Sequence, residues 1–283
     1  IGLSDLTVKW TPGKAVTRLL FINNGVEQSF DVSSAEATAG SKDVTGITKG
    51  ANEIRIQNGN LVRGKQNYTL EGDAYLAATD DFATSITNLS AGGVLLVAPC
   101  ANIGFVGPIT LTKSIKIRGL NNTSLPTIYV QTLPSLAHMF TLGTTLTSAD
   151  SVVFQDVILS GYVNNVAGSK TRGVFDQQVG TCNVGAIKFK GCIVRNFDRH
   201  AVRIRGDVTQ VVGTISIDKC VMYDFAFGAN YGVINSSAAP ATINNIIITN
   251  STIYNTRGSV ITYTAGAACQ GITISNCTFN QLA

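Results

Sequence analysis

The chain has 283 residues, of which 45% are hydrophobic and only 13% are charged. This balance excludes an intrinsically disordered chain, which needs high charge and few apolar residues, and the length fits one or two domains. The formal net charge of +4 is too small to indicate a nucleic-acid-binding protein, and no apolar run approaches the roughly 18 to 20 residues of a membrane span.

Residues 1–72 show the pattern of a small β-sandwich, in which short alternating strands are separated by turn sequences such as Asn58-Gly59. The predicted strands are Leu6–Trp10, Arg18–Ile22, Val26–Val32, Lys42–Ile47, Asn52–Gln57 and Asn67–Leu70. Trp10, the only tryptophan, is expected to anchor the core of this unit.

The order and spacing of these strands resemble a fibronectin type III module. Val44–Ile47 followed by Ala51–Ile54 stands in the place of that family's penultimate turn and strand. Too little chain precedes Leu6 for a complete first strand, so a sandwich truncated at its start is an alternative.

The segment Leu70–Thr79 is interpreted as a linker, and a helix is predicted at about residues 80–91. Phe82, Ile86 and Leu89 recur at helical spacing and form one apolar stripe. We expect this helix to cover the first end of the structure that follows it.

A buried strand is predicted immediately after the helix, because Val94–Pro99 is apolar without alternation. Further short strands are expected at Ile109–Leu111, Ile115–Arg118 and Thr127–Val130.

Five similar segments then recur: Phe154–Tyr162, Phe189–Phe197, Ile217–Phe225, Ile248–Thr256 and Ile274–Leu282. Aligning them forms one column of Val157, Cys192, Cys220, Ser251 and Cys277, and a second column of Leu159, Val194, Met222, Ile253 and Phe279. Copies of the first column lie 35, 28, 31 and 26 residues apart. Repeats of this length indicate stacked supersecondary units, with rungs about 4.8 Å apart and like residues over like.

The apolar helix, the Gly92-Gly93 pair, the buried strand and Lys113–Gly119 together resemble the first coils of the pectin-lyase-like superfamily. The resemblance covers about residues 80–283 and implies an all-β chain with a right-handed parallel β-helix over residues 73–283. That superfamily includes lyases, hydrolases, epimerases and non-catalytic adhesins, so it leaves the activity open. Chains with a sandwich before such a helix also resemble secreted bacterial surface proteins associated with polysaccharide use.

The main candidate site lies between residues 170 and 206, where eight basic residues accompany two acidic ones. In His200–Arg205, strand alternation turns the apolar residues inward and Arg203 and Arg205 outward, about 7 Å apart. Two outward guanidiniums can hold a carboxylate or sulfate bidentately. The alternative is an ordinary solvated strand whose charges deter edge pairing.

A uronic-acid lyase would need a cation to neutralise the substrate carboxylate and a base to remove the C5 proton. The candidate catalytic residues are His200, Arg203 and Arg205, with either arginine as the neutraliser. The candidate bases are His200, Lys188, Lys190 and Arg199. The candidate substrate-binding residues are Arg172, Lys188, Lys190, Arg199, Tyr231 and Tyr263, in which the tyrosines are platforms for sugar rings.

Other chemistry has less support. Hydrolysis is disfavoured because no two carboxylates form a close pair in the repeats, and no cofactor or metal is predicted.

The six cysteines contain no CxxC pair, and those in the repeat column are interpreted as small buried hydrophobes. His138 is expected to be structural, without an obvious partner. A turn ladder that tolerates left-handed backbone is predicted at Asn250, Asn276, Asn196, Asp224, Asn255 and Gln281.

The sequence therefore predicts a secreted, periplasmic or cell-surface protein whose partner is a polysaccharide, acidic or neutral, and not a nucleic acid. Three hypotheses remain: a glycan-binding protein, a polyuronate lyase and a structural surface spacer.

No signal segment is present, and the chain begins at Ile1, so a removed targeting segment is an alternative. After the last repeat no lid is visible, which predicts that further sequence or a partner covers that end. The oligomeric state is not predicted.

Overall fold

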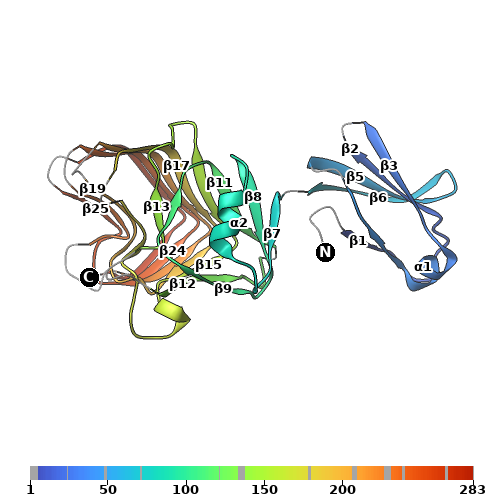
Figure 1. Cartoon of the computed structure of the whole chain (residues 1–283), viewed down its shortest axis with the longest axis horizontal. Helices are drawn as coiled ribbons and strands as arrows, with labels where there is room; N and C mark the ends of the chain where they lie inside the picture. Colours follow the sequence, from blue (N-terminus) through green and yellow to red (C-terminus); the bar gives the residue numbers. More distant parts are fainter. Residues whose placement is uncertain are drawn as a thin grey trace. The chain divides into compact units, whose positions relative to one another are not determined.

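A computed structural model describes residues 6–23, 25–47, 50–70, 72–120, 122–132, 138–177, 180–205, 209–225, 231–237, 240–264 and 267–282. The chain divides into two compact units, Ile1–Tyr75 and Leu76–Ala283 (Figure 1). Within the described ranges, no helix has the length and apolar character needed to cross a membrane.

The first unit consists of two antiparallel sheets and one short helix. One sheet has the strand order β3-β2-β5-β6, and the other pairs β1 with β4. The strands are β1 (Leu6–Lys9), β2 (Arg18–Asn23), β3 (Val26–Asp31), β4 (Ser41–Val44), β5 (Gly50–Asn58) and β6 (Leu61–Leu70). Val8, Leu19, Phe21 and Val44 meet in one core, against which a partly buried Trp10 packs. The predicted strands are therefore present, although β6 begins well before the predicted Asn67.

Helix α1 (Ser34–Ala39) was not predicted from the sequence. Ser33 Oγ accepts a hydrogen bond from the Glu36 backbone N–H at 3.3 Å, and the Glu36 carboxylate accepts one from the Ser33 N–H at 2.8 Å. This reciprocal pair is a capping box, and Gly40 ends the helix with a left-handed φ of 71°. The Ser-x-x-Glu spacing was the available sequence signal.

The second unit is a parallel β-solenoid in which each full coil contributes one strand to each of three sheets. Sheet 1 contains β7 (Ala74–Leu76), β8 (Gly93–Val97), β11 (Ile115–Gly119), β14 (Ser151–Gln155), β17 (Cys182–Lys190), β20 (Gln210–Asp218), β23 (Ala241–Thr249) and β26 (Ala268–Ser275). Sheet 2 contains β9 (Asn102–Val106), β12 (Thr127–Thr132), β15 (Ile158–Ser160), β18 (Ile193–Arg195), β21 (Val221–Phe225), β24 (Thr252–Thr256) and β27 (Thr278–Leu282). Sheet 3 contains β10 (Ile109–Leu111), β13 (Phe140–Leu142), β16 (Gly173–Gln177), β19 (His200–Arg205), β22 (Ile234–Ser237) and β25 (Ile261–Thr264). The predicted parallel β-helix is confirmed.

The first coils differ from the prediction at one point. β7 lies inside the segment interpreted as a linker, and that interpretation was wrong: Leu76 is fully buried, and its carbonyl accepts a hydrogen bond from Ala98 N–H at 3.0 Å. Helix α2 (Phe82–Asn88) follows, with Asp81 as its N-cap. The Phe82 ring centroid lies 5.1 Å from that of Phe105, so α2 packs on the first coil, as Figure 1 shows.

The core of the solenoid is built from vertical columns, as the repeat predicts. In sheet 2 the register aligns Leu159 with Val194, Met222 and Ile253, and all four are 0% exposed. Cys192 and Cys220 are buried and, like the other cysteines, free, which confirms their prediction as core residues. Phenylalanines from successive coils stack in the same core; Phe154 and Phe189, for example, have ring centroids 5.6 Å apart.

The corners of the coils require left-handed backbone. Asn250 and Asn276 have φ values of 52° and 53° at the corner between sheets 1 and 2. The other predicted positions of the turn ladder also have left-handed backbone, with φ between 50° and 64° at Asn196, Asp224, Asn255 and Gln281. Asn250 Nδ2 donates to Asp218 Oδ1 at 2.9 Å, and Asn276 Nδ2 donates to Asn250 Oδ1 at 3.3 Å. The predicted turn ladder is confirmed.

Replacing Asn250 with alanine is expected to lower the free energy of unfolding by about 1–2 kcal/mol, because a Cβ-bearing residue without a local hydrogen bond is strained at positive φ. Asn250→Gly also loses the side-chain hydrogen bonds to Asp218 and Asn276, but glycine is not strained at positive φ. The glycine variant should therefore lose less stability than Asn250→Ala. Urea denaturation of the three proteins measures the difference. An alanine variant as stable as the wild type would contradict this account.

Candidate functional site

The outer face of sheet 3 aligns side chains from neighbouring coils. The strand register places Asp176 of β16 beside Arg203 of β19, and Arg203 beside Asn235 of β22. Within β19, Val202 and Ile204 are fully buried, whereas Arg203 and Arg205 are half-buried. The two arginines therefore project from the outer face, in the direction that strand alternation predicts.

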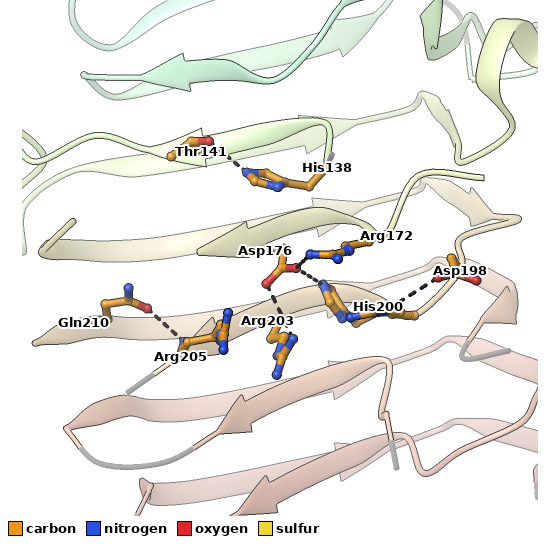
Figure 2. A network of polar contacts seen from close by, with 10 residues as sticks. His138, Thr141, Arg172, Asp176, Asp198, His200, Arg203, Arg205 and Gln210 are labelled. Atoms are coloured by element: carbon orange, nitrogen blue, oxygen red, sulfur yellow. Dashed lines mark hydrogen bonds and ion pairs between the residues drawn. The ribbon is translucent and has the colours of Figure 1, made fainter. Parts of the chain in front are cut away.

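Asp176 is the buried centre of this face (Figure 2). Its Oδ2 lies 4.0 Å from Arg172 Nη1 and 3.9 Å from His200 Nε2, and its Oδ1 lies 4.0 Å from Arg203 Nη1. The Asp176 side chain is 0% exposed, whereas those of Arg172 and Arg203 are 15% and 14% exposed. The arginines thus cover the carboxylate, and their positive charge offsets the cost of removing it from water.

His200 is the first residue of β19. Its side chain is 0% exposed, and a Cβ at Gly173 would lie only 2.4 Å from His200 Cδ2, so the ring needs a glycine at that position. Burial, with the charges of Arg203 and Arg199, holds the pKa of His200 well below its ordinary value. The imidazole is therefore neutral at neutral pH. Among the described residues, neither ring nitrogen has a hydrogen-bond partner.

Tyr231 organises the guanidiniums at the edge of this face. Its ring centroid lies 4.9 Å from Arg199 Cζ and 5.4 Å from Arg203 Cζ, which are cation–π distances. Arg199 also contacts the exposed Asp198, with Nε and Oδ2 3.5 Å apart. Tyr231 was predicted as a platform for a sugar ring, but in this structure its ring contacts arginines. We call Arg172, Asp176, Arg199, His200, Arg203 and Tyr231 the arginine cluster.

The remaining predicted residues divide into two groups. Arg205 lies on the outer face of β19, and its backbone N–H donates to Gln210 Oε1 at 2.9 Å. Lys188 and Lys190 are exposed on β17, which belongs to sheet 1, so they do not join the arginine cluster.

Tyr263 points the other way. The register aligns it with Ser236 and Ile204, two fully buried positions, and its hydroxyl is buried. Burial also raises the pKa of Tyr263, with the Cys269 thiol as a second cause. Tyr263 was predicted as a platform for a sugar ring, but its alignment with Ser236 and Ile204 turns its side chain inward.

Sequence reasoning missed two members of this face. Asp176 was counted only as one of the two acidic residues between residues 170 and 206, although it aligns with Arg203 when the strands between repeats are superimposed. His138 was expected to have no obvious partner, but its Nε2 lies 2.9 Å from Thr141 Oγ1, and its pKa is lowered by burial. The Asp176 charge opposes that shift, which places His138 at the border of the arginine cluster.

The arrangement is suited to binding anions. Arg172, Arg203 and the neutral His200 surround the buried Asp176 carboxylate, and Arg199 adds a third guanidinium beside Tyr231, so positive charge exceeds negative charge within the arginine cluster. No group of three or more His, Cys, Asp or Glu side chains that could hold a metal ion occurs in the described part of the chain. The side chains of the arginine cluster that carry polar chemistry are guanidinium, imidazole and carboxylate groups, with the phenol of Tyr231 beside them.

Comparison with known families adds one finding. Residues 101–256, more than half of the chain, match a family described as a domain of unknown function, DUF4957. The chain belongs to the DUF4957 family. No curated protein matches the chain. The match begins just before β9 and ends with β24, so the arginine cluster lies within the DUF4957 region.

In this DUF4957 protein, Asp176→Asn is expected to lower the free energy of unfolding by about 1–3 kcal/mol, because buried guanidinium groups lose their counter-charge. Asp198→Asn is the matched control. It removes the same charge from a side chain that is 42% exposed, so it should cost no more than about 1 kcal/mol. Urea denaturation of both variants tests the ranking, and equal stabilities would show that Asp176 does not hold the cluster together.

Proposed function

We propose that this DUF4957 protein binds an acidic polysaccharide on the outer face of sheet 3. The observation that supports this proposal is the gathering of Arg172, Arg199 and Arg203 around one buried carboxylate and one tyrosine. A guanidinium presents paired N–H donors in a plane, which matches the two oxygens of a carboxylate or sulfate. Guanidiniums that are already held in place lose less conformational entropy when such a group binds.

The geometry of the sheet supports a polymer as the ligand. Successive coils of a parallel solenoid repeat at about 4.8 Å, so an extended chain lying along sheet 3 meets equivalent positions on several coils. Arg203 and Arg205 lie on the same strand, and the outer face continues to Asn235 and Ser237 on β22. A glycan with an anionic group on each sugar could therefore contact cationic and polar side chains of successive coils.

We extend the proposal to the context of the protein. The parallel β-solenoid resembles pectin-lyase-like β-helices, and the antiparallel unit before it resembles a fibronectin type III module. Such chains resemble secreted bacterial surface proteins that are associated with polysaccharide use. A secreted or cell-surface location agrees with an acidic glycan as the partner.

The double variant Arg203→Ala/Arg205→Ala is expected to bind immobilised polyuronate about 10- to 100-fold more weakly, because each lost charge-assisted contact contributes about 1.5–3 kcal/mol before water replaces part of it. Retention on columns of polygalacturonate, alginate and a sulfated glycan measures the change. Circular dichroism shows whether the variant is folded.

The matched control is Lys188→Ala/Lys190→Ala, which removes the same charge from sheet 1. This variant should be retained like the wild type, since its side chains lie on a different sheet from the arginine cluster. If both double variants lose retention equally, net charge rather than the outer face of sheet 3 governs binding. If neither does, the binding proposal is wrong and a structural spacer is favoured.

A second candidate function is β-elimination on a polyuronate, and the neutral imidazole of His200 favours it. A base must be unprotonated, and the low pKa of His200 keeps it so, while Arg203 could neutralise the substrate carboxylate. Because His200 is 0% exposed, this chemistry would require the side chains that cover it to move aside.

For the lyase alternative, incubation with pooled alginate, pectate and glycosaminoglycans should release unsaturated products that absorb ultraviolet light. His200→Asn should abolish that absorbance and leave column retention unchanged, since the asparagine keeps a polar group but cannot act as the base. Absence of product from every polyuronate would remove the lyase alternative and leave the binding proposal in place.

A further inference from the structure

Tyr231 brings together two guanidiniums that come from different positions of the chain. Arg199 precedes β19 and Arg203 lies within that strand, whereas Tyr231 belongs to the next coil and precedes β22. Arg199 Cζ lies 4.9 Å and Arg203 Cζ lies 5.4 Å from the centroid of the tyrosine ring. One aromatic ring therefore contacts two cations of the neighbouring coil.

These two guanidiniums are only partly neutralised by the protein. The Asp176 carboxylate lies 4.0 Å from Arg203 Nη1, which is too long for a hydrogen bond, and its charge is shared with Arg172. Among the described residues, the buried Nε of Arg203 has no hydrogen-bond partner. Arg199 contacts Asp198, whose side chain is 42% exposed, so water screens that ion pair. Both cations therefore retain charge that a bound anion could neutralise.

The two like charges also act on each other. Burial is the largest cause that lowers the pKa of Arg203, and the positive charge of Arg199 is a further cause. The Asp176 carboxylate opposes this shift. An anionic group between the two guanidiniums would offset their repulsion and would give hydrogen-bond acceptors to their N–H donors.

We infer that Arg199 and Arg203 together hold one oxyanion of the glycan, a carboxylate or a sulfate, and that Tyr231 is the positioning residue of this subsite. The inference rests on the proposed function and assigns the first contact to one pair of arginines. Arg172 has a different role, because it forms its ion pair with the buried Asp176. The tyrosine ring restricts both guanidiniums before the ligand arrives, so less conformational entropy is lost on binding.

Titration calorimetry with polygalacturonate and with dextran sulfate tests the inference on the 283-residue chain. Tyr231→Leu should bind about 5- to 30-fold more weakly, because two cation–π contacts are lost while every charge remains. Tyr231→Phe keeps the face of the ring and should bind within about twofold of the wild type. The salt dependence of the affinity should be unchanged in Tyr231→Leu and weaker in Arg203→Ala, since only the second variant loses an ion pair.

Tyr254→Leu is the matched control for the loss of a tyrosine ring. Tyr254 lies on β24 of sheet 2, where its ring stacks on that of Tyr223 with centroids 4.9 Å apart, so this variant should bind like the wild type. Arg199→Lys keeps the positive charge and removes the planar guanidinium, and it should bind more weakly than the wild type. The polyanion whose binding depends on Tyr231 identifies the oxyanion as a carboxylate or a sulfate.

Equal affinities of Tyr231→Leu and the wild type would overturn the inference, as would an equal loss of affinity in Tyr231→Phe or Tyr254→Leu. If circular dichroism shows that Tyr231→Leu is unfolded, Arg199→Lys decides, and wild-type affinity in that variant contradicts the subsite. A wild type that binds neither polyanion rejects the proposed function itself. Binding that is lost in Arg203→Ala/Arg205→Ala but retained in Tyr231→Leu rejects the subsite alone.

Discussion

The vertical register between coils is the constraint on which the rest of this structure depends. Strands of successive coils pair in parallel, so a side chain in one coil lies over its equivalent in the next. Inside, this register stacks Phe154 on Phe189 and keeps Leu159, Val194 and Met222 out of water. It also explains why cysteines occupy core positions without chemistry of their own, since a small apolar residue is what the column needs.

On the outer face of sheet 3 the same register brings oppositely charged side chains of neighbouring coils together. The register holds Asp176 beside Arg203 of the next coil, and Arg172, four residues earlier in the same coil, approaches the same carboxylate. Burying the carboxylate is tolerable only because guanidiniums cover it, and covering it orders those guanidiniums. The neutral state of His200 has the same origin, because burial and nearby positive charge both disfavour the imidazolium. The acidic polysaccharide that we propose as the ligand has the opposite charge to these guanidiniums.

The first end of the solenoid core is covered by a helix. A stack of coils always leaves an apolar cross-section and free strand edges at each end. At the first coil, α2 supplies Phe82 and Ile86 to close the core. At the last described coil, Ile274 and Phe279 continue the columns of Ile248 and Ile253.

The fold class, the inward columns and the outward direction of Arg203 could be predicted from the sequence alone, because each follows from a local period of apolar residues. The left-handed corners such as Asn250 could be predicted from the conformational preference of asparagine. Tertiary structure decided the rest. Lys188 and Arg203 are close in sequence but lie on different sheets, and the parity of Tyr263 turns it into the core. The role of Asp176 as the buried carboxylate of the arginine cluster could not be predicted from the residues next to it in the sequence. That role depends on Arg203 and His200 of the next coil, whose alignment with Asp176 is set only when the strands pair.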